Sequence, residues 1–128
     1  MKLLLDTHVV LWWINEYEKL SANAKSALLD SENILHLSVA SIWEVAIKSS
    51  LGKMPGLNGR VGVLLSKIES MPIRLYPIEP RHIEIVEALP FIHRDPFDRM
   101  LISTAMADSM TILTTDENIH KYGVLTHW

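Results

Sequence analysis

The chain has 128 residues, a net charge of −3 and no cysteine, and 48% of its residues are hydrophobic. This length and composition suit one folded domain, which we expect to span residues 1–128. The lack of cysteine excludes disulfides and thiolate zinc sites, and the negative net charge argues mildly against a nucleic-acid partner.

The N-terminal stretch MKLLLDTHVVLWWINE is apolar but is neither a membrane span nor a typical secretory signal. Asp6 and His8 interrupt it, and no small-residue cleavage site follows. No apolar run in the chain reaches the roughly 18 residues that a spanning helix needs. Since a chain without cysteine also tolerates a reducing compartment, we expect a cytoplasmic protein without membrane contact.

The first half of the chain alternates short apolar runs with segments of helical periodicity. Val9, Trp12 and Trp13 have the i, i+3, i+4 spacing of a helix, Ser21 is a plausible helix cap, and Gly52 suits a helix end. The predicted elements here are a strand at 2–6, a helix at 7–15, a helix at 21–30, a strand at 34–38 and a helix at 41–53.

The second half continues this alternation after a glycine-rich stretch. Its predicted elements are a helix at 61–70, a strand at 73–78, a helix at 80–90, a helix at 95–110, a strand at 111–115 and a short strand at 124–128. Strands that alternate with helices imply crossover connections and a parallel sheet covered on both faces. The sequence therefore predicts an α/β fold, a three-layer α/β/α sandwich with a mainly parallel central sheet.

Four acidic residues lie where predicted strands end or predicted helices begin: Asp6, Glu44, Asp98 and Asp116. Ligands of parallel sheets bind beyond the carboxyl ends of the strands, so these side chains converge if their strands are neighbours. Crowded carboxylates repel one another, which raises a pKa unless a cation is present. Oxygen ligands without cysteine favour Mg²⁺ or Mn²⁺, whose chemistry suits hydrolysis of a phosphodiester.

Each of these acids also has a purely structural interpretation. Asp6 and Asp116 are typical helix-capping or turn residues, and Glu44 forms a capping-box pattern with Ser41. In DPFD, Asp95 is the expected N-cap of the helix. Asp98 is only partly explained by the helix dipole, because one cap already serves that end.

The stretches MKLLLDTHVVLWW, SVASIWEVAIK, HRDPFDRMLISTA and ILTTD together resemble the PIN-domain ribonucleases, in particular the VapC-type toxins of bacterial toxin–antitoxin pairs. They extend from residue 1 to residue 116, and their combination is more specific than any one of them. The resemblance implies a PIN-like sandwich and Mg²⁺- or Mn²⁺-dependent endonucleolytic cleavage of RNA. It carries the catalytic and metal-binding roles over to Asp6, Glu44, Asp98 and Asp116, and leaves Asp95 as a cap.

The resemblance also implies a cognate antitoxin that covers the site, and a homodimer. Trp12 and Trp13 are candidates for such contacts, with a place in the core as the alternative. Thr7 and Thr115 are candidates for orienting the carboxylates or a metal-bound water, with ordinary hydroxyls in turns as the alternative, while roles for Asn118 and His93 stay open. Six basic residues are either phosphate contacts or ordinary surface charges: Lys48, Lys53, Arg60, Arg74, Arg94 and Arg99.

Four other functions are alternatives to a nuclease. A Mg²⁺-dependent phosphatase of small phosphate esters would need an aspartate at the position of His8, and a receiver-type switch would need paired acids there. The HRD at 93–95 resembles a kinase catalytic loop, but Met100 stands where that loop needs asparagine. A catalytically inactive protein-binding module is the alternative outside enzymology.

Overall fold

The computed structural model describes all residues from 1 to 128. Its centre is a five-stranded sheet with the order β3-β2-β1-β4-β5, and every neighbouring pair is parallel. The strands are β1 (Lys2–Leu5), β2 (Ile34–Ser38), β3 (Ile73–Tyr76), β4 (Thr111–Leu113) and β5 (Thr126–His127). The predicted parallel sheet is thereby confirmed.

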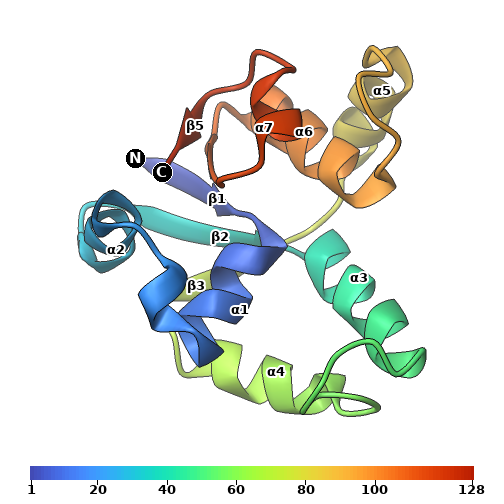
Figure 1. The fold of residues 1–128 in the computed structure, drawn as a ribbon. Coiled ribbons are helices and arrows are strands. Elements are labelled where there is room, and N and C mark those ends of the chain that lie inside the picture. The colour runs from blue at the N-terminus through green and yellow to red at the C-terminus, as the bar shows by residue number, and fades with distance from the viewer.

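Helices cover both faces of this sheet, which gives the predicted three layers. Figure 1 shows α1, α2 and α4 on one side of the strands and α5, α6 and α7 on the other. The helices are α1 (Thr7–Asn15), α2 (Ala22–Leu29), α3 (Val39–Ser50), α4 (Val61–Glu69), α5 (Pro80–Ala88), α6 (Pro96–Asp108) and α7 (Glu117–His120), with a short 3₁₀ turn, η1 (Tyr17–Lys19). None of them is both long and apolar enough to cross a membrane.

The central strand β1 explains why the core has two parts. Leu3, Leu4 and Leu5 are fully buried, and successive side chains of a strand point to opposite faces. Leu3 and Leu5 belong to the cluster packed under α1, α2, α3 and α4, whereas Leu4 belongs to the cluster under α5, α6 and α7. One short strand thus anchors both helical layers and holds its C-terminal end rigidly in place.

The observed boundaries differ from the predicted ones at α3, with a consequence for the site. This helix begins at Val39 rather than at residue 41, because Ser38 is its N-cap and accepts a hydrogen bond from the Ala40 N–H at 3.0 Å. The predicted capping box of Ser41 and Glu44 is therefore wrong, since both residues lie inside the helix. The helix ends at Ser50, and Gly52 follows with a φ of 72°.

Two short elements, η1 and α7, were not predicted. α7 lies between the last two predicted strands, where Asp116 caps the four-residue segment Glu117–His120. The strands β3, β4 and β5 are each shorter than expected, so two residues separate the end of β4 from Asp116.

Candidate active site

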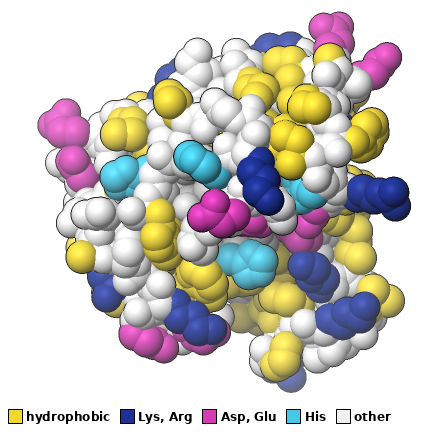
Figure 2. Space-filling model, turned by 45° about the horizontal axis from the view of Figure 1, so that its top comes forward, with side chains coloured by type: hydrophobic (Ala, Val, Ile, Leu, Met, Phe, Trp, Pro, Cys, Tyr) yellow, Lys and Arg dark blue, Asp and Glu magenta, His cyan; other side chains and the backbone are white.

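The site lies where the winding of the sheet reverses. From β1 the chain proceeds to β2 and β3 on one side, whereas β4 lies on the other side of β1. Such a switch point leaves a crevice beyond the carboxyl ends of the two strands. Asp6 follows β1 directly, and Asp116 lies three residues after the end of β4. In Figure 2, acidic, histidine and basic side chains gather near the centre of one face of the molecule, above a notch.

The carboxylate of Asp6 accepts a hydrogen bond from the hydroxyl of Thr114, the residue that follows β4. Its side chain does not cap a helix. It occupies the N-cap position of α1, but its carboxylate makes no capping hydrogen bond. Instead, Thr114 Oγ1 donates to Asp6 Oδ2 at 2.7 Å and accepts from the Asp116 N–H at 3.0 Å. Only 4% of Asp6 is exposed. The capping interpretation is wrong for this buried carboxylate.

Glu44 reaches the same site from α3. Thr7 Oγ1 donates to its Oε1 at 3.0 Å, and Lys48 Nζ donates to its Oε2 at 2.9 Å. Because Thr7 directly follows Asp6, this bond brings α3 to the end of β1. Ser41, one turn earlier in α3, is buried, and its hydroxyl has no hydrogen-bond partner.

The two aspartates at the start of α6 have different contacts. Asp95 Oδ1 accepts from the N–H groups of Phe97 at 2.9 Å and Asp98 at 3.2 Å, which confirms Asp95 as the helix cap. Asp98 caps nothing, and its Oδ2 lies 3.2 Å from His93 Nε2. The His93 ring is in turn held by the hydroxyl of Tyr122, 2.9 Å from Nδ1.

Asp116 has a capping role as well as a place near the other acids. Its Oδ1 accepts from the Asn118 N–H at 2.8 Å, so the predicted cap is confirmed. Its Oδ2 and the Oδ1 of Asp98 accept no hydrogen bond from the chain. Both of these oxygens are therefore available to a ligand.

The electrostatics show that the aspartates form one group. The pKa of Asp98 is raised to about 7, mainly by burial and then by the charges of Asp95, Asp6 and Asp116, while the bond to His93 opposes the rise. Burial also raises the pKa of Asp6, with a smaller contribution from Asp116 and opposing ones from Thr114 and His8. The expected rise in pKa is confirmed, although burial contributes more to it than repulsion. We call Asp6, Glu44, Asp98 and Asp116 the acidic rim.

Lys48 is the only lysine or arginine that forms an ion pair with the acidic rim. Its hydrogen bond to Glu44 raises the pKa of its ammonium group, and the charges of Asp95 and Asp98 add to that rise. This lysine, whose side chain is 44% exposed, pairs with one of the four rim carboxylates. The acidic rim therefore has fewer cationic partners than carboxylates.

The chemistry of the acidic rim fits a hard divalent cation. Its donors are carboxylate oxygens, which Mg²⁺ and Mn²⁺ prefer over sulfur or nitrogen ligands. In the conformation described here, no three histidine, aspartate or glutamate side chains are close enough to share one ion. Binding a cation would thus need the side chains of Asp98 and Asp116, which have free oxygens, to move toward Asp6.

Sequence comparison identifies the family. The family model described as PIN domain matches residues 3–125. The chain belongs to the PIN domain family. Over 124 residues this PIN domain is 30% identical to Ribonuclease VapC22 of Mycobacterium tuberculosis (strain ATCC 25618 / H37Rv), a match that covers 93% of the chain and 90% of that relative. The predicted resemblance to VapC-type members is confirmed.

Solved structures share the fold of this PIN domain. One is VapBC2 from Rickettsia felis, bound to a DNA fragment from their promoter, with a TM-score of 0.75 and 15% identity; the match covers 99% of this chain and 98% of that one. Another is FitAcB from Neisseria gonorrhoeae, with a TM-score of 0.71 and 18% identity, covering 98% and 96% of the two chains. At these identities the likeness concerns the fold.

Of the two threonine candidates, Thr7 bonds to Glu44, whereas Thr115 bonds to no acid and Thr114 supports Asp6 instead. Thr115 is exposed and its side chain makes no hydrogen bond, whereas Thr114 is 4% exposed and bridges Asp6 and Asp116. The stretch TILTTD, residues 111–116, could have predicted the pairing of Thr114 with Asp116. Residues two apart in extended chain share a side, which places Thr114 with Asp116.

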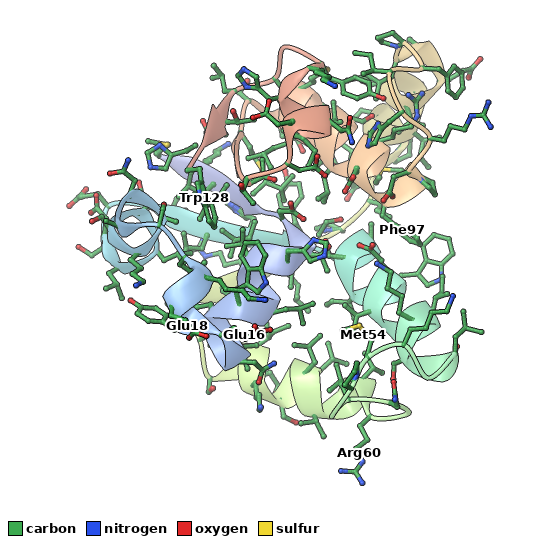
Figure 3. All side chains as sticks on the ribbon, viewed as in Figure 1. Glu16, Glu18, Met54, Arg60, Phe97 and Trp128 are labelled. Carbon is green, nitrogen blue, oxygen red and sulfur yellow. The ribbon has the colours of Figure 1, made fainter.

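The six basic candidates are spread over the PIN domain rather than gathered at the acidic rim. Arg60 lies at the start of α4, far from the rim (Figure 3). Arg99 is buried, and its guanidinium donates to the carbonyls of Val86, Leu89 and Pro90 and to the hydroxyl of Tyr122. Lys48 alone contacts a predicted site acid.

Trp12 and Trp13 are half-buried and pack against the core cluster under α1. Trp12 also makes an edge-to-face contact with Trp128, with 5.9 Å between the ring centroids (Figure 3 labels Trp128). The alternative of a core position is thus confirmed in part for both residues. A role in partner contacts stays a prediction.

Proposed function

We propose that this PIN domain is a divalent-metal-dependent endoribonuclease and the toxin of a toxin–antitoxin pair. The observation that supports the proposal is the acidic rim: acids from four separate segments face the switch point of the sheet, and burial is the main cause that raises the pKa of two of them. The similarity to Ribonuclease VapC22 supports RNA as the substrate.

In this proposal the four acids of the rim hold Mg²⁺ or Mn²⁺. Asp6, Asp98 and Asp116 are direct ligands, and Glu44 binds directly or through water. When bound, the cation supplies Lewis-acid activation of the phosphodiester and of the attacking water. Before it binds, the raised pKa of Asp98 favours a proton on its carboxylate, held beside His93.

Neighbouring side chains keep the rim acids in place. Thr114 fixes Asp6 Oδ2, and Thr7 fixes Glu44 Oε1. Lys48 holds Glu44 Oε2 and partly neutralises the rim in the absence of a cation. Supporting hydrogen bonds of this kind typically change metal affinity or activity by about 10- to 100-fold.

The proposed partners are RNA, a cognate antitoxin and a second copy of the chain, and the proposed location is the cytoplasm. The solved relatives VapBC2 and FitAcB support the antitoxin, because they are named as two-protein assemblies. RNA as a substrate and a chain without cysteine both suit the cytoplasm.

The function can be tested by treating the purified protein with EDTA, adding total RNA with or without Mn²⁺, and mapping the ends produced. We expect discrete internal cuts only when Mn²⁺ or Mg²⁺ is returned. Cleavage in excess EDTA would contradict the metal dependence. Release of phosphate from small esters with intact RNA would support the phosphatase instead, and inactivity toward both would support the protein-binding module.

A further inference from the structure

Four side chains behind the acidic rim form a continuous chain of hydrogen bonds: Arg99, Tyr122, His93 and Asp98. Arg99 and Asp98 belong to α6, His93 precedes that helix, and Tyr122 follows α7, which lies beside α6 in Figure 1. Arg99 and Tyr122 are buried, and the side chains of His93 and Asp98 are only 14% and 15% exposed. Water has little access here, so these polar groups depend on one another for their hydrogen bonds. We call these four residues the His93 network.

The Arg99 guanidinium is the fixed end of the His93 network. Its Nη1 donates to the Pro90 carbonyl at 2.7 Å and to the Tyr122 hydroxyl at 3.0 Å. Its Nη2 donates to the carbonyls of Leu89 at 3.2 Å and Val86 at 3.3 Å. Each of these nitrogens thus uses both of its hydrogens within the chain. Arg99 therefore holds the Tyr122 oxygen in place rather than binding a substrate.

The Tyr122 hydroxyl decides which nitrogen of His93 carries a hydrogen. This hydroxyl has one hydrogen to donate and two lone pairs that accept. Two groups that can only donate fill the lone pairs: Arg99 Nη1 at 3.0 Å and the His93 backbone N–H at 3.2 Å. Its other neighbours are His93 Nδ1 at 2.9 Å and the His93 carbonyl at 3.3 Å. A hydrogen on Nδ1 would be a third donor to a filled oxygen, so Nδ1 carries none and accepts from Tyr122.

This arrangement gives the two oxygens of Asp98 separate roles. A neutral imidazole without a hydrogen on Nδ1 carries it on Nε2. His93 Nε2, 3.2 Å from Asp98 Oδ2, therefore donates to that oxygen. Asp98 Oδ1 accepts no hydrogen bond from the chain. A carboxylate held at Oδ2 can still turn Oδ1 toward Asp6.

We propose that His93, kept in its Nε2–H form by Tyr122 and Arg99, is a positioning residue that holds Asp98 Oδ2 and leaves Oδ1 for the cation. The inference rests on the proposed function and names residues that shape its metal site without binding the metal. Hydrogen bonds to a ligand carboxylate fix its orientation and typically change metal affinity or activity by about 10- to 100-fold. If His93 contacted an RNA phosphate instead, its loss would change KM and not metal affinity.

The form of the His93 ring can be measured in the metal-free protein at pH 8, from the ¹⁵N chemical shifts of its two nitrogens. The signals that disappear in His93→Gln identify the residue. We expect a hydrogen on Nε2 and none on Nδ1 in the unaltered protein, and a mixture of both forms in Tyr122→Phe. A hydrogen on Nδ1 in the unaltered protein would overturn the inference.

The effect on metal binding can be measured as the Kd for Mn²⁺ without RNA, by electron paramagnetic resonance. His93→Gln and His93→Asn are a matched pair, because the amide nitrogen of glutamine reaches the place of Nε2 and that of asparagine only the place of Nδ1. We expect Kd to rise about tenfold in His93→Asn and Tyr122→Phe, and to stay within about twofold in His93→Gln. Tyr76→Phe is the control, since it removes a hydroxyl bonded to Asp108 at the other end of α6, and it should keep the Kd. Thermal unfolding checks that each variant folds.

The results separate this inference from the proposed function. If the unaltered protein and all four variants bind Mn²⁺ equally well, the inference is wrong and the proposed metal site stands. The same holds if His93→Gln loses as much affinity as His93→Asn, or if the variants change only KM for RNA. If the unaltered protein does not bind Mn²⁺, both proposals fail.

Discussion

Two groups of ionisable side chains in this chain have opposite electrostatics. Asp108, at the end of α6, accepts from Tyr76 Oη at 2.6 Å, from His82 Nε2 at 2.6 Å and from Arg81 Nε at 2.7 Å. These partners, Arg81 first, hold the pKa of Asp108 well below its usual range. At the other end of the same helix, burial and the nearby aspartates raise the pKa of Asp98 to about 7.

The difference lies in the number of donors that each carboxylate has. Asp108 accepts hydrogen bonds from a guanidinium, an imidazole and a phenol. These donors already compensate its negative charge, so the carboxylate does not need a cation. Asp98 has one imidazole contact and three aspartates nearby that raise its pKa. A carboxylate with enough donors stabilises a fold, whereas a buried one without them indicates a site for a cation.

The largest predicted effect concerns the rim. Asp98→Asn should reduce Mn²⁺-dependent RNA cleavage by at least about 100-fold, because a direct ligand should matter no less than the groups that support it. Asp108→Asn, at the other end of α6, is the matched control and should keep most activity. Equal losses in the two variants, measured with one RNA at saturating Mn²⁺, would contradict the distinction between the two groups.

The next effect concerns the hydroxyl that supports the rim. Thr114→Val should reduce activity by about 10- to 100-fold, because Asp6 loses its only side-chain hydrogen bond. Thr115→Val should have little effect, since the Thr115 side chain is exposed and makes no hydrogen bond. Restored activity in Thr114→Ser would show that the hydroxyl is what matters. A stronger effect at Thr115 would instead favour Thr115 as the candidate that orients the carboxylates.

Asp108 should contribute to the stability of the fold rather than to activity. Asp108→Asn should lower the free energy of unfolding by about 2 kcal/mol, because hydrogen bonds to a charged group are replaced and the fully buried His82 loses its partner. Urea unfolding at neutral pH measures this. An unchanged midpoint would mean that the network around Asp108 contributes no net stability.

A smaller effect is expected at the cap of α6. Asp95→Ala should cost about 1 kcal/mol of stability, since two N–H groups of the first turn lose their acceptor. It should spare most activity, because Asp95 accepts hydrogen bonds only from the helix. Activity loss as large as that of Asp98→Asn would place Asp95 among the ligands.

The sequence was sufficient to predict the layered parallel sheet and the placement of Asp6 and Asp116 beyond the ends of β1 and β4. The fully buried leucines of β1 and the apolar runs of β2 and β4 were visible as short strands, and the acids after them followed from the topology. The sequence also separated Asp95 from Asp98, because one helix end needs only one such cap. These features depend on local patterns that tertiary contacts did not override.

The features that the sequence did not predict depend on contacts between distant segments of the chain. The sequence contains a capping-box pattern at Ser41 and Glu44, but Ser38 caps the helix first, which leaves Glu44 free to meet Thr7. The contact between His93 and Asp98 needs the Tyr122 hydroxyl, 29 residues away, to hold the ring. No local pattern encodes such a long-range hydrogen bond.

The central claim is that the acidic rim has too few cationic partners for its carboxylates. The free energy of unfolding, measured as a function of pH, tests this claim most directly. The raised pKa means that Asp98 binds more protons when folded than when unfolded between about pH 4 and 7. Its contribution to the stability of the metal-free protein therefore falls as pH rises through that range. Asp108 acts oppositely: its contribution is present above about pH 4 and is lost as pH falls further.

The decisive measurement is the free energy of unfolding at pH 5 and pH 8, in EDTA and in Mn²⁺, for the unaltered protein and Asp98→Asn. We predict that stability in EDTA falls between pH 5 and pH 8 by more in the unaltered protein than in Asp98→Asn. At pH 8, Mn²⁺ should restore the unaltered protein and leave the variant unchanged. Equal pH dependence in the two proteins, with no stabilisation by Mn²⁺, would contradict the account.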